Sequence, residues 1–126
     1  MATGIYTAEH VEGWRSVTEA VHARGGAVFI QLMHAGRMSH PDNTPHHRQP
    51  MAPSAISADQ NILTPTGPQK TPSPRELSAE DIQATVADFR LAAASAIAAG
   101  ADGVEIHGAN GYGADGGARG PLRTQP

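Results

Sequence analysis

The stretch AVFIQLM, residues 27–33, and the stretch GVEIH, residues 103–107, decide the fold. Successive side chains of a strand point to opposite faces of its sheet, so alternate residues share a face. In the first stretch, Gln31 is the polar residue on the face opposite three aliphatic side chains. In the second, Glu105 and His107 alternate with two aliphatic side chains. Each stretch therefore predicts a strand with one aliphatic face and one face that carries polar groups.

A helix is predicted to connect these two strands. Residues 78–81, SAED, resemble a capping box, with Asp in place of the usual Glu or Gln at the last position. Gly100 is the predicted stop of the helix. The apolar residues after the cap recur at helical spacing and predict the buried face: Ile82, Val86, Phe89, Ala93 and Ile97. A strand, a helix and a second strand form a βαβ unit, in which the two strands are parallel.

Two further segments complete the order of elements. Residues 7–24 are predicted to form a helix with Thr7 as its N-cap and Gly25 in its stop signal. Its predicted apolar stripe consists of Val11, Trp14, Val17 and Val21. Residues 34–77 are expected to form a long loop, because eight of the ten prolines fall in this segment.

The two-faced strands favour one α/β architecture over another. In a (β/α)8 barrel, or TIM barrel, the aliphatic face of each strand packs against helices and the other face lies inside the barrel. A doubly wound sheet is expected to carry apolar residues on both faces. A complete barrel needs about 250 residues, and the chain has 126. We therefore expect a fragment of a (β/α)8 TIM barrel, made of two αβ units with a long Pro-rich loop.

The composition excludes several classes of protein. A formal net charge of −3 gives no electrostatic reason to expect binding to nucleic acid or to a membrane surface. The lack of cysteine excludes disulfides, thiolate metal sites and a cysteine nucleophile. No apolar run approaches the roughly 20 residues of a membrane span, and residues 1–6 do not resemble a signal peptide. We expect a cytoplasmic location.

The candidate site follows the second strand. Active sites of barrels lie at the carboxyl ends of the strands, where His107, Asn110 and Tyr112 fall within six residues of one another. Gly108 and Gly111 allow the backbone to turn sharply between them. Such a cluster of hydrogen-bonding groups is suited to binding an anion, polarising a carbonyl group or coordinating a metal.

Four histidines of the predicted loop offer a second candidate, a metal site. They are His34, His40, His46 and His47. Their spacing matches no common zinc pattern, and the chain has no cysteine to serve as a further ligand. We therefore expect no metal site.

Four stretches resemble the Old Yellow Enzyme family of FMN-dependent ene-reductases. They are GIY at residues 4–6, QLMHAGR at 31–37, APSAI at 52–56, and ADGVEIH at 101–107 with its continuation to Tyr112. They occur in the family order and at family-like spacing. The resemblance covers roughly residues 4–112, and it implies that the two predicted strands are the third and fourth of the barrel.

The resemblance implies roles for five residues. Gln31 resembles the glutamine that hydrogen-bonds the polar edge of the flavin ring. His107 and Asn110 resemble the pair that binds the carbonyl or nitro oxygen of the substrate, and Tyr112 resembles the proton donor to the substrate α-carbon. Met33 stands where many members of the family have tryptophan, which implies a more adaptable wall of the substrate pocket.

The activity that the resemblance implies is an NAD(P)H-dependent oxidoreduction. The nicotinamide reduces FMN, and the flavin then passes hydride to an activated alkene, such as an enone, or to a nitro compound. Most barrel strands and the phosphate-binding loops after the seventh and eighth are not among the 126 residues, so we expect this chain to be inactive alone. The alternatives are a non-catalytic remnant and a small His-rich binding module that holds a metal.

The last residues depart from the family pattern. Residues 113–126 contain four glycines and two prolines and are predicted to form a divergent, disordered tail. Residues 1–112 are then a partial flavin-oxidoreductase barrel. A frameshift is one hypothesis for the tail, and family-like sequence in another reading frame just after the Tyr112 codon would support it.

Overall fold

The computed structural model describes residues 4–108. The predicted tail, Asn110 and Tyr112 therefore lie outside the described residues. The chain divides into two compact parts. Residues 4–32 and 80–106 form the helix–strand part, and residues 33–79 with 107–108 form the loop part.

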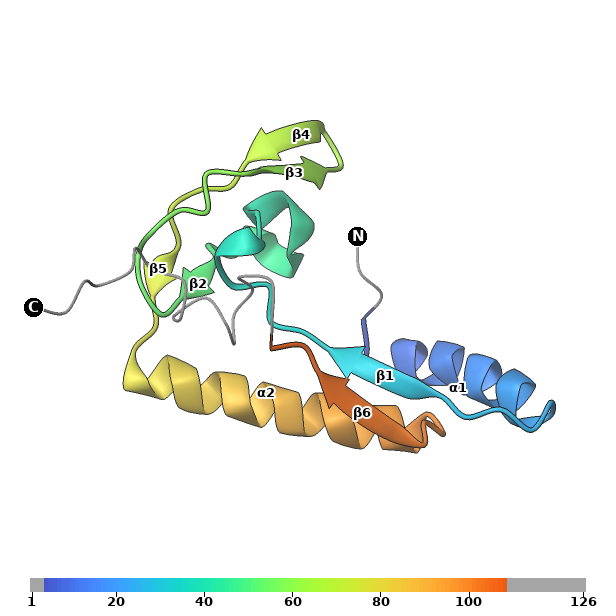
Figure 1. Ribbon diagram of the computed structural model, residues 1–126. Coiled ribbons are helices and arrows are strands. Elements are labelled where there is room, and N and C mark those ends of the chain that lie inside the picture. Colours follow the sequence, from blue (N-terminus) through green and yellow to red (C-terminus); the bar gives the residue numbers. More distant parts are fainter. Residues whose placement is uncertain (1–3, 109–126) are drawn as a thin grey trace, which may run out of the picture. The chain divides into compact units, whose positions relative to one another are not determined.

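The helix–strand part contains the predicted βαβ unit. In chain order its elements are α1 (Ala8–His22), β1 (Phe29–Leu32), α2 (Ala79–Ala98) and β6 (Gly103–Ile106). β1 and β6 lie side by side as a parallel pair (Figure 1). Gln31 is the register partner of Glu105. The prediction of two parallel strands with a helix between them along the chain is confirmed.

The core of this part lies on the aliphatic face of β1. Ile30 and Leu32 are 6% and 5% exposed, and they form one cluster with the buried Ala96 and Ala101. Partly buried side chains from the helices, the strands and the N-terminal segment surround this cluster: Ile5, Trp14, Val28, Phe89, Ala92, Ala93 and Val104. Phe29 and Gln31 alternate with the buried residues of β1 and are exposed. The predicted division of β1 into an aliphatic face and a polar-bearing face is confirmed.

α1 begins as predicted but buries a different residue. The Thr7 hydroxyl accepts a hydrogen bond of 3.2 Å from the His10 backbone N–H, and His10 Nδ1 accepts one of 3.4 Å from the Thr7 N–H. This is a capping box with histidine at the position usually taken by Glu or Gln. Val17, predicted for the apolar stripe, is 47% exposed, whereas Thr18 is 1% exposed. The Thr18 hydroxyl can be buried because it lies 2.6 Å from the Ala99 carbonyl oxygen, to which it donates.

α2 packs only part of its predicted apolar face against the core. Three residues of the predicted buried face are about half exposed: Ile82 at 51%, Val86 at 54% and Ile97 at 54%. Phe89 and Ala93 do pack against the core, and Ala96 is completely buried. Alanine side chains allow a helix to approach its neighbours closely, so the buried face follows the alanines rather than the larger aliphatic residues.

The loop part has more regular structure than the sequence predicts. It begins with three 3-10 turns: η1 (Gly36–Met38), η2 (Pro41–Asn43) and η3 (Pro45–His47). Two parallel strands follow, β2 (Met51–Ala52) paired with β5 (Arg75–Glu76). An antiparallel hairpin is made by β3 (Asn61–Thr64) and β4 (Gly67–Lys70) (Figure 1). The prediction of one continuous loop over residues 34–77 is wrong in this respect.

Proline and glycine explain this difference. Pro41 and Pro45 each occupy the first turn of a 3-10 helix, where a missing backbone N–H leaves no hydrogen bond unmade. Pro65 lies in the turn between β3 and β4, and Gly67 closes this turn with a φ of 107°, which favours glycine. The prolines in this segment therefore start turns as well as interrupt strands.

Candidate functional site

The exposed face of the β1–β6 pair carries the first group of candidate residues. Gln31 and Glu105 are register partners on this pair, and both side chains are exposed. Two register positions earlier, and so on the same face, Phe29 is the partner of Gly103. A Cβ atom on Gly103 would lie 2.5 Å from Cε1 of Phe29, so the phenyl ring covers the glycine. The face thus presents an aromatic ring followed by an amide and a carboxylate.

The chemistry of this amide and carboxylate is complementary. The side-chain amide of Gln31 both donates and accepts hydrogen bonds, whereas an ionised Glu105 only accepts them. Neither strand contributes a Lys, Arg or His within its bounds, Phe29–Leu32 and Gly103–Ile106. The site therefore offers a ligand one mixed donor and acceptor, with a negative charge beside it.

The amino ends of the two strands are tied together by Asp102. Its carboxylate Oδ2 accepts a hydrogen bond of 2.7 Å from the Val28 N–H and lies 2.9 Å from Nε2 of His22. The Asp102 N–H in turn donates to the Val28 carbonyl oxygen at 2.9 Å. The hydrogen bond with His22, and then that from Val28, lower the pKa of the Asp102 carboxyl below its ordinary value of 3.8. These contacts hold the register that makes Gln31 and Glu105 partners.

The remaining predicted site residues follow the carboxyl ends of the strands. Met33 comes directly after β1 and is 43% exposed, and His107 comes directly after β6 and is half-buried. Both residues belong to the loop part, whereas Gln31 belongs to the helix–strand part. Asn110 and Tyr112 lie outside the described residues. The structure therefore brings Gln31 together with Glu105, and it places Met33 and His107 at the two points where the paired strands end.

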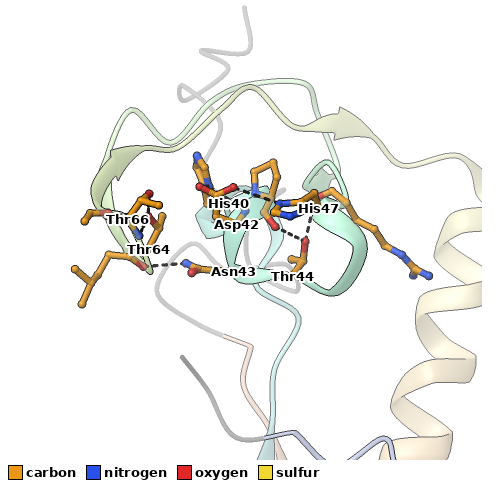
Figure 2. Close-up of polar contacts among 11 residues, drawn as sticks. His40, Asp42, Asn43, Thr44, His47, Thr64 and Thr66 are labelled. Atoms are coloured by element: carbon orange, nitrogen blue, oxygen red, sulfur yellow. Dashed lines mark hydrogen bonds and ion pairs between the residues drawn. The ribbon is translucent and has the colours of Figure 1, made fainter.

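The histidine-rich turns of the loop part are held by an aspartate. In Figure 2, Asp42 lies between His40 and His47: its Oδ2 is 3.6 Å from Nδ1 of His40, and its Oδ1 is 3.3 Å from Nδ1 of His47. The Asp42 N–H donates to Nδ1 of His40 at 3.2 Å. Asn43 then links these turns to the hairpin by donating to the Leu63 carbonyl oxygen at 2.9 Å (Figure 2). These contacts connect the turns to one another and to the hairpin, so their role is structural.

The described part of the chain has neither a cluster of metal ligands nor a membrane-spanning helix. Over residues 4–108, no group of three or more His, Asp or Glu side chains is arranged so that it can hold a metal ion. Within the same range, neither helix is long and apolar enough to cross a membrane.

Sequence reasoning passed over two residues that the structure singles out. The sequence places Glu105 on the same face as His107 but indicates no role for it, and the register adds that it lies opposite Gln31. Asp102 stands just before a strand that begins with glycine, and its contacts reach residues 74 and 80 positions away along the chain. No local pattern in the sequence predicts such distant partners.

The chain is similar to known proteins over most of its length. The model of the NADH:flavin oxidoreductase / NADH oxidase family matches residues 1–115. The 12-oxophytodienoate reductase 7 of Oryza sativa subsp. japonica is 47% identical over 112 residues, covering 86% of this chain and 28% of that protein. A probable flavin mononucleotide-dependent alkene reductase of Leishmania infantum is 44% identical over 114 residues, covering 86% of this chain and 31% of that protein.

Two solved structures are similar to this chain in fold. Morphinone reductase is similar with a TM-score of 0.80 and 41% identity, over 87% of this chain and 31% of that one. The old yellow enzyme homologue from Zymomonas mobilis has a TM-score of 0.82 and 41% identity, over 86% of this chain and 30% of that one. Both are TIM-barrel proteins of the old yellow enzyme type, as expected for the fold class. The chain spans less than a third of the length of these relatives.

Proposed function

The chain belongs to the NADH:flavin oxidoreductase / NADH oxidase family, and we propose that residues 4–112 supply the part of an FMN-dependent ene-reductase that contacts the flavin ring and the substrate. In this proposal β1 and β6 are the third and fourth strands of the barrel. The observation that carries it is the parallel pairing of β1 with β6, with Gln31 on the face opposite the helices. That face is the interior of a closed barrel.

The residues of this face suit a flavin. The polar edge of a flavin ring alternates carbonyl oxygens with a ring N–H, so it needs a partner that both donates and accepts. The exposed amide of Gln31 meets this requirement. FMN, when bound, would supply the hydride chemistry, and the protein would supply orientation and a surrounding that excludes water.

The residues after β6 would act on the substrate. His107 and Asn110 would donate hydrogen bonds to the carbonyl or nitro oxygen, where negative charge develops during hydride transfer. Tyr112 would donate a proton to the α-carbon, which becomes basic enough to take a proton from a phenol. Met33, directly after β1, would form an adaptable wall of the substrate pocket.

The substrate class in this proposal is a small activated alkene, such as an enone, or a nitro compound, with NADH or NADPH as the hydride donor. The names of the relatives support the class, since they include an alkene reductase and reductases of 12-oxophytodienoate and morphinone. The matched segment covers 28% to 31% of each of these relatives. The whole activity therefore requires a complete barrel.

The 126 residues alone are proposed to hold no stoichiometric FMN and to have no ene-reductase activity. Gln31 can offer only one or two hydrogen bonds to the ring, and the phosphate-binding loops of a barrel follow its last two strands. Large apolar side chains would also face water in the isolated chain, among them Phe29 at 66% and Ile106 at 61% exposed. Unpaired strand edges add to the tendency to aggregate.

The test compares the chain with a completed barrel. In this barrel, named the grafted barrel, residues 4–112 replace the matching segment of morphinone reductase. We expect the purified grafted barrel to carry about one FMN and to reduce 2-cyclohexenone with NADH, and the 126-residue chain to carry none. A grafted barrel that is folded by circular dichroism but colourless and inactive would overturn the proposed function. If the isolated chain binds one equivalent of FMN, the prediction that the 126 residues alone cannot hold the cofactor is wrong.

A further inference from the structure

We propose that Glu105 is a positioning residue for Gln31. Once a barrel closes over this face, its carboxylate accepts a hydrogen bond from the Gln31 side-chain N–H, and this bond fixes which end of the amide faces the flavin. The inference deepens the proposed function and rests on it. It concerns a residue that has no role in the scheme above.

The register of the two strands carries the inference. Gln31 and Glu105 are partners in the parallel β1–β6 pair, so their side chains leave the sheet on the same face. Neighbouring strands lie about 4.8 Å apart, which is within reach of two side chains of this length. Within the two strands, as the structure describes them, the Gln31 amide is the one side chain that can donate a hydrogen bond to a carboxylate.

Burial in a barrel makes this bond necessary. Both side chains are exposed here, but their face becomes the interior once a barrel closes over it. A carboxylate removed from water requires hydrogen-bond donors. The Phe29 ring, which covers Gly103 two register positions earlier on the same face, offers none. His107, two residues after Glu105, is assigned to the substrate oxygen. The amide of Gln31, directly opposite Glu105 in the register, is therefore the donor assigned to this carboxylate.

The chemistry of the amide explains what the bond would do. The oxygen and nitrogen ends of a glutamine amide are nearly equal in shape, so packing alone does not select between its two orientations. Glu105 accepts and cannot donate when ionised, so it selects the orientation with the nitrogen toward β6. The amide oxygen and the second N–H then remain for the flavin edge. A pre-set orientation lowers the cost of ordering the side chain when FMN binds.

A double-mutant cycle in the grafted barrel tests the inference. The variants are Gln31→Ala, Glu105→Leu and the double variant, and the measurement is the dissociation constant for FMN. We expect each single variant to weaken FMN binding about tenfold. The double variant should bind no more weakly than either single variant, because Glu105 acts through Gln31. Glu105→Gln should restore part of the loss, since its carbonyl oxygen still accepts but both amide orientations become possible.

Each outcome of the cycle is informative. Losses that multiply to about a hundredfold in the double variant would overturn the inference, as would a Glu105→Leu barrel that binds FMN as tightly as the parent. If Gln31→Ala leaves FMN binding unchanged, the assigned role of Gln31 fails and the inference fails with it. If the Leu variant does not fold, the cycle uses Glu105→Gln instead, whose weaker loss must disappear in the Gln31→Ala background.

Discussion

The carboxylate of Asp102 accepts a hydrogen bond of 2.7 Å from the backbone N–H of Val28. This contact joins the residue before β6 to the residue before β1, and the Val28 carbonyl oxygen accepts from the Asp102 N–H in return. Asp102, the aspartate of the ADGVEIH stretch, therefore has a structural role: it links the amino ends of the two strands. In TIM barrels this end serves stability, whereas the carboxyl end carries the site.

Replacing the Asp102 carboxylate should lower stability in a pH-dependent way. Its pKa is lowered in the folded chain, so its contribution is present above the ordinary value of 3.8 and is lost as the pH falls toward the folded pKa. In the grafted barrel, Asp102→Asn should lower the melting temperature at pH 7. The difference from the parent should shrink as the pH falls below about 4.

Asp88→Asn is a matched control, because Asp88 lies exposed on α2. The control should melt close to the parent at both pH values. An Asp102→Asn deficit that stays constant from pH 7 to pH 3 would contradict the ionic origin of the effect.

Removing the Thr18 hydroxyl should destabilise the packing of α1. The hydroxyl lies 2.6 Å from the Ala99 carbonyl oxygen just beyond α2, and its side chain is 1% exposed. Thr18→Val keeps the volume but leaves this carbonyl without that donor, at a cost of about 1–2 kcal/mol in the free energy of unfolding. Thr85→Val is the control, since Thr85 donates to the Asp81 carbonyl oxygen four residues earlier in its own helix. If urea denaturation shows the same loss in the free energy of unfolding for both variants, the hydrogen bond to Ala99 contributes no more to stability than a bond within one helix.

Adding a methyl group at Gly103 should disturb the exposed face of the sheet. The new Cβ would lie 2.5 Å from the Phe29 ring, which must move. We expect Gly103→Ala to lower the free energy of unfolding by about 1–3 kcal/mol, and Phe29→Leu in the same chain to restore much of it. Gly13→Ala is the control, because a Cβ there meets nothing within 4 Å and alanine favours a helix. Failure of Phe29→Leu to compensate would mean that the glycine is required for another reason.

The strands and the helix between them could be predicted because their signals are local. The alternation in AVFIQLM and GVEIH and the cap before α2 are patterns of two to four residues, and the structure confirms the elements that they predict. The buried face of α2 could not be read from apolar spacing, because Ala96 is buried while Ile82 and Val86 are about half exposed. The choice between them depends on how closely the helix approaches the sheet, which is a tertiary property.

In the loop part, too, contacts between residues distant in the sequence could not be predicted. The 3-10 turns at Pro41 and Pro45 could not be predicted, because the proline content of this segment favours a loop. The pairing of β2 with β5 joins residues 24 positions apart through two short strands and has no periodic signal. At the candidate site, alternation alone places Gln31 on the polar-bearing face, whereas its partnership with Glu105 requires the register.

If Tyr112 is the proton donor, its removal should affect only one of the two half-reactions, the oxidation of reduced flavin by the substrate. In the grafted barrel, Tyr112→Phe should slow the oxidation of reduced flavin by 2-cyclohexenone and leave the reduction of flavin by NADH unchanged, because only the first needs the proton. Stopped-flow absorbance of the flavin measures both rates. Tyr6→Phe is the matched control, since Tyr6 is 70% exposed near the start of α1, and it should change neither rate. Equal slowing of both half-reactions by Tyr112→Phe would exclude the proton-donor role.

The most direct test of the account is the turnover of the grafted barrel after both proposed oxygen-binding donors are removed. His107→Ala together with Asn110→Ala should lower the rate of 2-cyclohexenone reduction by a factor on the order of 10² or more. The flavin content should remain at about one FMN per chain, because Gln31 is intact. Unchanged turnover in the double variant, with FMN still bound, would contradict the claim that this segment activates the substrate.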